Sequence, residues 1–280
     1  MSVAIVTDSA AALPPELAAR HGIGVVPMWL TVNGEPEPEG LRSLEDLVAQ
    51  PEVSTSAPTP GDFESAIKDA ARVHDGVVVL TIASTMSATF AAAGVAAQAV
   101  GGDVRVVDTA TAGGAEALVV LAAAAAAAAG CSLDEVEARA RAVIGRVRLV
   151  ATISTLDHLV RSGRVPGIAG WAGRRLGINP LFEFRDGSAR RLRPALSRDA
   201  ALDRIVDRVL RECPGDGARL HVAGLHALAV DVAEELLTRV RELSTPATEF
   251  VGEFGPVMVV HTGPGLAGLA WWWEDAGGVR

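Results

Sequence analysis

The sequence predicts an α/β protein with two domains: an N-terminal Rossmann-like parallel sheet with flanking helices, and a smaller C-terminal α/β domain with a mixed or antiparallel sheet. In the first half, short apolar runs alternate regularly with helical segments, which is typical of βαβ units. Small hydroxyl or acidic residues follow each apolar run. Near residue 150 this alternation ends, so we expect domains at 1–150 and 151–280, with a ligand between them.

The elements of the first domain follow from hydrophobic periodicity and from helix-start signals. Thr59 before Pro60 indicates an N-cap, and the spacing of Ser132 and Glu135 is that of a capping box. Gly130 ends an alanine-rich helix. We expect strands at 3–6, 24–32, 77–82 and 104–107, and helices at 13–20, 44–50, 60–73, 87–100, 117–129 and from 132 to about 148.

The second domain has shorter strands and a denser positive charge. Between Arg161 and Arg198 the chain holds nine arginines and two acidic residues, Glu183 and Asp186. We expect strands at 181–184, 220–225, 250–253 and 256–260, a return strand after the turn at 186–187, and helices at 200–211 and 230–243.

Composition excludes several functional classes. The formal net charge of −9 and the pI of about 5.2 disfavour a nucleic-acid partner. Lys68 is the only lysine, and it is not part of a Gly-x-x-x-x-Gly-Lys-Ser/Thr loop, so P-loop nucleotide hydrolysis is excluded. The apolar stretch 117–129 is too short to cross roughly 30 Å of hydrocarbon. Cys131 and Cys213 form no Cys-x-x-Cys pair, and no signal peptide begins the chain, so we expect reduced thiols, no metal site and a cytoplasmic location.

Two hydroxyl-rich segments are candidate ligand sites, and the second lies where a parallel strand ends, which is where α/β sheets bind ligands. In the segment 55–63, capping explains Thr59 but leaves Thr55 and Ser56 without a role. In the segment 84–90, one hydroxyl suffices to cap a helix, although four are present. Ser84 and Ser87 there are candidates for holding an anion near a helix N-terminus.

The third candidate is His261, at the end of the apolar run 256–260. Gly263, Pro264 and Gly265 follow, and their tight turn could leave backbone N–H groups bare for a charged ligand group. Together with Gly268 they match a dinucleotide fingerprint, but the next residues indicate a strand and not the helix that this fingerprint needs. A nucleotide- or phosphate-binding regulator built on this turn is therefore a weaker alternative.

The combination of serine and histidine also suggests a second class of function, nucleophilic catalysis. Ser87 or Ser84 with His261 could form an acyl hydrolase or acyltransferase. No Gly-x-Ser-x-Gly elbow exists, however, and no acidic residue is identified that would orient the imidazole. This enzyme remains the main alternative to a binding protein.

Seven motifs, in order and spacing along essentially the whole chain, resemble the DegV family. They are Thr7-Asp-Ser9, Thr55-Ser-x-Pro-Thr-Pro-Gly-Asp-Phe63, Ser84-x-Met-Ser-Ala-Thr-Phe90, Val107-Asp-Thr109, Leu156-x-x-Leu-Val-Arg-Ser-Gly-Arg164, Leu176-Gly-Ile-Asn-Pro-Leu-Phe182 and His261-Thr-Gly-Pro-Gly265. The resemblance implies a protein that is not itself an enzyme and that holds one long-chain fatty acid between its domains. It also implies a partner, the ATP-using subunit of a fatty acid kinase, to which the fatty acid is presented for phosphorylation.

By motif position, the resemblance assigns the fatty-acid carboxylate to Thr55, Ser87 and His261, with Ser56 and Ser84 close by. It also assigns an arginine, best aligned with Arg198. It implies no catalytic residue, no cofactor besides the bound fatty acid, and no stable membrane insertion. We further expect arginines of the segment 161–198 near the carboxylate to steer an acidic partner.

The sequence departs from the family pattern at three places. The usual Leu-Ser-Gly-Thr-Tyr is Met86-Ser-Ala-Thr-Phe90, and the usual Ile-Lys-Pro is Ile178-Asn-Pro180. Pro194 interrupts the stretch before Arg198. The first change concerns the preferred acyl chain, and the other two concern Arg198 and a nearby partner surface.

Overall fold

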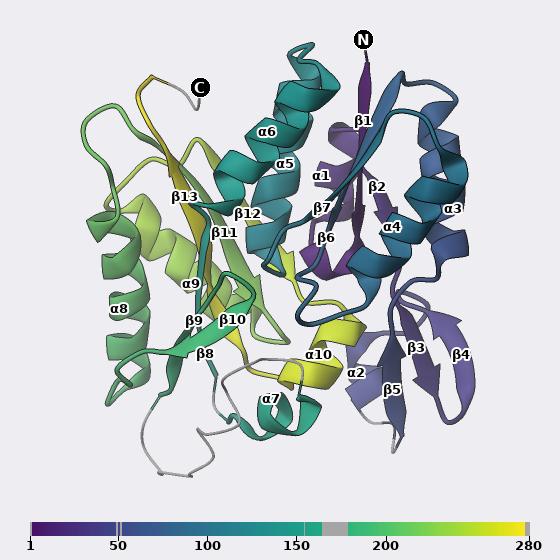
Figure 1. The fold of residues 1–280 in the computed structure, drawn as a ribbon. Helices are drawn as coiled ribbons and strands as arrows, with labels where there is room; N and C mark the ends of the chain where they lie inside the picture. Colours follow the sequence, from purple (N-terminus) through teal and green to yellow (C-terminus); the bar gives the residue numbers. More distant parts are fainter. Residues whose placement is uncertain (1, 49, 51, 154, 164–178, 278–280) are drawn as a thin grey trace.

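The computed structural model describes residues 2–48, 50, 52–153, 155–163 and 179–277. Its strands form a four-stranded, a six-stranded and a three-stranded sheet (Figure 1), which we call sheets A, C and B. This confirms the predicted α/β class with one parallel and one mixed sheet. The cut between domains at residue 150 stays a prediction.

Sheet A has the order β2-β1-β6-β7, and all of its strands are parallel. Its strands are β1 (Val3–Asp8), β2 (Gly24–Val26), β6 (Gly76–Thr81) and β7 (Val104–Asp108). The flanking helices are α1 (Pro15–Arg20), α3 (Pro60–Ala71), α4 (Thr89–Val100), α5 (Gly114–Ala128) and α6 (Leu133–Ile144). The predicted N-cap at Thr59 and the predicted capping box of Ser132 with Glu135 are both present, and Thr59 also forms a capping box with Asp62.

Sheet C has the order β10-β9-β8-β13-β11-β12, and of its neighbouring pairs only β11 with β12 is parallel. Its strands are β8 (Arg148–Thr152), β9 (Leu181–Arg185), β10 (Ser188–Arg191), β11 (Arg219–His226), β12 (Thr248–Glu253) and β13 (Ala267–Glu274). Helices α8 (Arg198–Arg211) and α9 (Val230–Arg241) pack against one face of this sheet (Figure 1).

The alanine-rich helix α5 lies between sheets A and C (Figure 1). It contacts β1 on one side and β11 and β13 on the other, so a helix of small side chains lets two sheets approach one helix closely. At its first residue, a Cβ added to Gly114 would lie 2.5 Å from Leu225 Cδ2. One apolar core therefore continues from sheet A to sheet C.

The expected strand at 256–260 is wrong, because these residues belong to the helix α10 (Pro256–Thr262). A short apolar run does not distinguish a buried strand from a buried helix. Here the helical form is favoured by Pro256 at the first helical position, and the N–H of Val257 donates to the carboxylate of Glu39 at 2.8 Å. Gly263, with φ of 75°, ends the helix.

The single strand expected at 24–32 is also wrong, because it is divided between two sheets. After β2 the chain leaves sheet A at Pro27, which lacks the N–H that a sheet ladder needs. It then forms β3 (Trp29–Val32), the middle strand of sheet B between β4 (Glu35–Pro38) and β5 (Val53–Ser56). The remaining short elements are η1 (Ser9–Ala11), α2 (Leu44–Val48) and α7 (Asp157–Ser162).

Within the described part of the chain, every helix is too short or too polar to cross a membrane.

Candidate functional site

A narrow cavity of about 50 Å³ lies where helix α10, sheet B and the segment after β6 meet. Four of the six candidate residues line it: Thr55, Ser56, Ser87 and His261. The rest of its described wall is almost entirely apolar and comprises Met28, Ala57, Ile82, Met86, Leu159, Val257, Met258 and Thr262. The described lining includes no Asp, Glu, Lys or Arg, so its polar groups are hydroxyls and one imidazole.

Thr55 and His261 meet directly, although 206 residues separate them in the sequence. Thr55 lies on β5, and His261 lies in the last turn of α10. A hydrogen bond of 2.8 Å joins Thr55 Oγ1 to His261 Nε2. Strand β5 of sheet B and helix α10 therefore bring together two of the residues that the motifs indicate.

Ser87 lies at the start of helix α4. Its Oγ is 2.7 Å from Thr89 Oγ1 and accepts a hydrogen bond from the N–H of Thr89 at 3.3 Å. This places the hydroxyl at the positive end of the helix dipole, a favourable position for an anion. Ser56 is exposed at the rim of the cavity.

The structure does not bring the other two candidates to the cavity. Ser84 is exposed, and its N–H donates to Asp108 Oδ1 at 3.2 Å. Arg198 begins α8 on sheet C, where its Nη2 lies 2.8 Å from a carboxylate oxygen of Glu235. Arg198 is thus engaged with α9 on the far side of sheet C from α5 (Figure 1).

The glycine turn after His261 does not offer bare N–H groups, contrary to expectation. The N–H of Gly263 donates to Val259 O and that of Gly265 to Ala227 O, each at 2.7 Å. A Cβ on Gly263 would lie 2.6 Å from the ring of His158, and one on Gly268 would lie 2.3 Å from Val150 O. These glycines therefore serve the turn and close packing. The strand β13 follows them, as expected, and not the helix of a dinucleotide fingerprint.

Glu39 is a residue of this region that the sequence did not reveal. Its carboxylate accepts hydrogen bonds from Ser9 Oγ and from the N–H of Val257, while Ser9 Oγ accepts the N–H of Met28 at 3.0 Å. One carboxylate thereby links two residues of the cavity wall, Met28 and Val257. Burial raises the pKa of Glu39, although these hydrogen bonds oppose the shift.

Two further carboxyl groups are fully buried near the end of β1. Asp8 accepts the N–H of Ile82 at 2.9 Å and that of Ala10 at 3.0 Å, so it holds the end of β6, where Ile82 lines the cavity. Burial raises the pKa of Asp8 to about 7 despite these two hydrogen bonds. Burial and the nearby charge of Asp8 raise the pKa of Glu116 well above its ordinary value. Among the described residues, no group of three His, Cys, Asp or Glu is arranged to hold a metal ion.

This geometry agrees with the family comparison, in which the DegV family model matches residues 2–274. The chain belongs to the DegV family. A DegV domain-containing protein of Mycobacterium tuberculosis is 34% identical over 276 residues, which cover 96% of each chain. The chain is also 29% identical over 280 residues to a protein of Thermotoga maritima named a fatty acid-binding protein, covering 96% of this chain and 97% of the relative.

A solved DegV structure from Thermus thermophilus, described as fatty-acid binding, superposes with a TM-score of 0.90 at 28% identity. The match covers 97% of this chain and 99% of that protein. The resemblance seen in the motifs and the predicted fold class are both confirmed, and the relatives from Thermotoga maritima and Thermus thermophilus are described as binding fatty acids.

Proposed function

We propose that this DegV protein binds one long-chain fatty acid non-covalently and acts as a carrier and not as a catalyst. The observation that supports this most directly is the pairing of Thr55 with His261 in an otherwise apolar cavity, with Ser87 also in its lining. A carboxylate taken out of water needs several hydrogen-bond donors, and two hydroxyls and an imidazole provide them.

The tail supplies the affinity in this proposal. At roughly 0.8 kcal/mol per buried methylene, a chain of about 14 methylenes contributes on the order of 11 kcal/mol before entropic costs. The cavity volume of about 50 Å³ is smaller than the volume of such a tail, so the side chains that line the cavity must move apart when the tail binds. Met28, Met86 and Met258 line it, and unbranched methionine side chains adapt their shape easily.

Mass spectrometry of the purified protein tests this proposal. Under native conditions we expect a mass excess of one fatty acid, which disappears on denaturation. A mass excess that survives denaturation would indicate a covalent acyl-enzyme on Ser87 or Ser84 and would favour the hydrolase. Protein purified from lipid-rich cells with no excess at all would contradict the carrier.

We further propose that the protein presents the carboxylate to an ATP-using kinase subunit. A second hollow of about 480 Å³ lies beside α10, and His261 lines both this hollow and the cavity. Arg161, which is exposed on α7, also lines the second hollow. A carboxylate held at His261 would therefore lie close to a surface that carries a positive charge, which favours an acidic partner and an acyl phosphate product.

Formation of acyl phosphate from ATP, in a mixture with the kinase subunit, measures this step. Arg161→Glu and Arg191→Glu should slow it, most strongly at low salt, without loss of the bound fatty acid. We expect the same effect from Arg164→Glu, since Arg164 belongs to the same arginine-rich segment 161–198, but this residue lies outside the described residues. Arg72→Glu, on the exposed end of α3, is the matched control. Turnover that is equal in all variants across a salt series would exclude a docking role for these arginines.

A further inference from the structure

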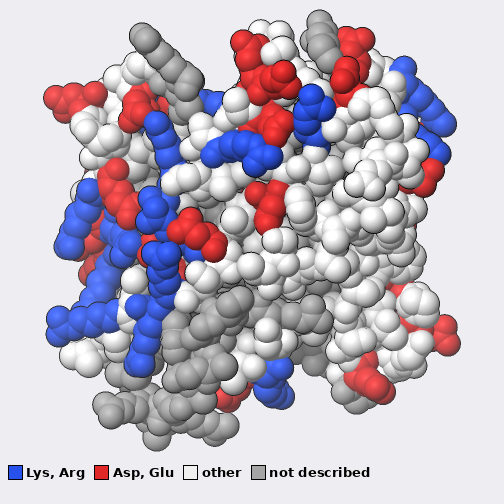
Figure 2. Space-filling view, in the orientation of Figure 1, with Lys and Arg blue, Asp and Glu red and all other residues white. Residues whose placement is uncertain are grey.

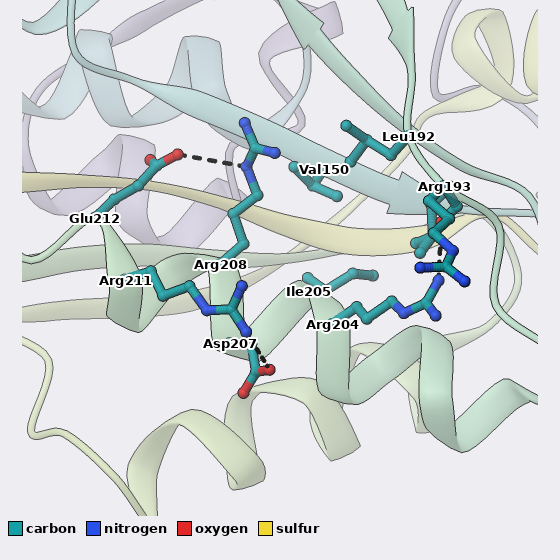
Figure 3. Close-up of a pocket in the computed structure, with 10 residues that line it drawn as sticks. Val150, Leu192, Arg193, Arg204, Ile205, Asp207, Arg208, Arg211 and Glu212 are labelled. Atoms are coloured by element: carbon teal, nitrogen blue, oxygen red, sulfur yellow. Dashed lines mark hydrogen bonds and ion pairs between the residues drawn. The ribbon is translucent and has the colours of Figure 1, made fainter.

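A third hollow, of about 540 Å³, lies on sheet C beside helix α8, which packs against β8 and β13 (Figure 3). Four arginines line it: Arg193, before α8, and Arg204, Arg208 and Arg211, on α8. We call it the arginine groove. Its only acidic lining residues in the described chain are Asp207 and Glu212. The space-filling view shows arginines gathered over the same side of the molecule, around α8 and the β9–β10 hairpin (Figure 2).

The acidic residues neutralise two of these four arginines. Arg208 Nη2 lies 2.9 Å from a carboxylate oxygen of Glu183, and its Nε lies 3.4 Å from Glu212. Arg211 pairs with Asp207 at 3.1 Å, one helical turn away. Both acidic lining residues and the neighbouring Glu183 are thus already engaged.

Among the described residues, no carboxylate balances the charge of the other two arginines. Arg204 Nη1 donates to two main-chain oxygens, Arg193 O at 3.0 Å and Pro194 O at 2.6 Å, which fix its position without cancelling its charge. Arg193 has no carboxylate within ion-pair distance among the described residues. Figure 3 shows the two guanidinium groups side by side at one end of the groove, with Arg208 and Arg211 at the other.

Positive charge also accumulates behind the groove. Arg148 Nε lies 3.7 Å from a carboxylate oxygen of Glu212. Arg148 and Arg208 therefore share this one carboxylate. Burial and the nearby charge of Arg185 lower the pKa of Arg148. Arg185 Nε lies 3.5 Å from a carboxylate oxygen of Asp186, which Arg190 shares at 3.3 Å. The acidic residues of this region are therefore too few for its guanidinium groups.

The floor of the groove is apolar and consists of Val150, Leu181, Leu192 and Ile205. A volume of about 540 Å³ lies in the range of small-molecule sites, about 300–1,000 Å³, and is much larger than an inorganic anion requires. Guanidinium groups match phosphate oxygens in a bidentate arrangement. The groove thus combines an anion-binding end with an apolar surface.

We propose that the arginine groove binds an organic phosphate, with the phosphate on Arg193 and Arg204 and an apolar or aromatic portion over Val150 and Ile205. This site is separate from the cavity at His261, whose lining shares no residue with it. The proposal therefore stands or falls independently of fatty-acid binding.

Isothermal titration calorimetry with ATP as the probe tests this proposal, at low ionic strength and on the full chain with its bound lipid. ATP should bind more tightly than either inorganic phosphate or adenosine, because only ATP can contact both the pair of Arg193 and Arg204 and the apolar floor of the groove. Arg193→Gln should weaken ATP binding about tenfold, and the double variant with Arg204→Gln should weaken it further. The control Arg72→Gln should bind ATP like the parent protein.

The single variant Arg193→Gln should keep the fold intact. Among the described residues, the side-chain hydrogen bonds of Arg204 go to the main-chain oxygens of residues 193 and 194, which this substitution leaves in place. The variant's thermal unfolding midpoint and bound lipid should match those of the parent. Undetectable ATP binding at millimolar concentration would overturn the proposal, and so would ATP binding that Arg193→Gln leaves unchanged. An oligoglutamate peptide that binds more tightly than ATP would overturn it in favour of an acidic protein segment.

Discussion

The cavity at His261 and the arginine groove are built on opposite electrostatic principles. The cavity is narrow and carries only hydroxyls and an imidazole, whereas the groove is about ten times larger and carries four guanidinium groups. Neutral donors suffice where a single carboxylate is buried with an apolar tail, because a hydrogen bond in an apolar environment is strong and no buried cation has to be desolvated. In a hydrated groove, permanent positive charge is needed to hold an anion.

This contrast explains why charge content alone is a poor guide to the proposed fatty-acid site. The arginine-rich segment 161–198 attracts attention in a sequence with net charge −9, yet the described lining of the cavity contains none of its arginines. The hydroxyls at the ends of strands and helices are the better indicator.

The largest effect should come from placing a negative charge in the cavity. Met86→Glu should remove nearly all bound fatty acid, since an unpaired charge in a buried site costs about 3–5 kcal/mol and also repels the ligand carboxylate. Native mass spectrometry measures the lipid content, and ATP titration of the arginine groove should remain as in the parent. Met86→Leu keeps the volume and should retain the lipid. Full lipid occupancy in the Met86→Glu protein would show that the fatty acid binds elsewhere.

An intermediate effect should follow from loss of the head-group donors. Thr55→Ala, Ser87→Ala and His261→Ala should each weaken binding by about 1–3 kcal/mol in a displacement titration with a fluorescent fatty acid. Because Thr55 and His261 are hydrogen-bonded to each other, the double variant should lose less than the sum of the two single losses.

Ser84→Ala is the informative comparison for Ser87→Ala. Both serines follow β6, but only Ser87 lines the cavity. Ser84→Ala should therefore bind the fatty acid like the parent protein. Equal losses in the two variants would show that the motif, and not the cavity seen here, defines the carboxylate site.

Local signals in the sequence predict much of this fold. Alternating apolar runs gave the parallel sheet A, and Thr59 and Ser132 marked helix starts correctly, because these signals depend on residues within one or two turns. Motif spacing also led to Thr55, Ser87 and His261, which the structure brings to one cavity.

Long-range contacts could not be predicted in the same way. The helix α10 depends on Glu39, which lies 218 residues before Val257 and belongs to an acidic, proline-containing stretch typical of an exposed loop. Sheet B likewise required the chain to leave sheet A at Pro27. The position of Arg198 on α8, paired with Glu235, is set by packing between the two helices that cover sheet C.

Changes to the buried carboxyl groups should affect the binding of either ligand least. Their effect should be on the stability of the fold. Burial raises the pKa of Asp8 to about 7 and raises that of Glu116 well above its ordinary value, so the folded protein binds protons more tightly than the unfolded chain. The free energy of unfolding should then fall as the pH rises from about 4 to about 7, because ionisation becomes progressively easier in the unfolded chain than in the folded protein. This sign is opposite to that of a carboxylate stabilised by an ion pair.

Glu116→Gln isolates this contribution. Glu116 Oε1 accepts a hydrogen bond from Thr7 at 3.3 Å, whereas Oε2 has no hydrogen-bond partner in the described part of the chain, so the neutral amide preserves the one contact and removes the charge. Relative to the parent, urea denaturation should find the variant more stable at about pH 8 than at about pH 5. Glu16→Gln, in the first turn of α1 as Glu116 is in the first turn of α5, provides the exposed control. A stability difference between Glu116→Gln and the parent that does not change with pH would show that Glu116 retains the same proton affinity in the folded protein and the unfolded chain.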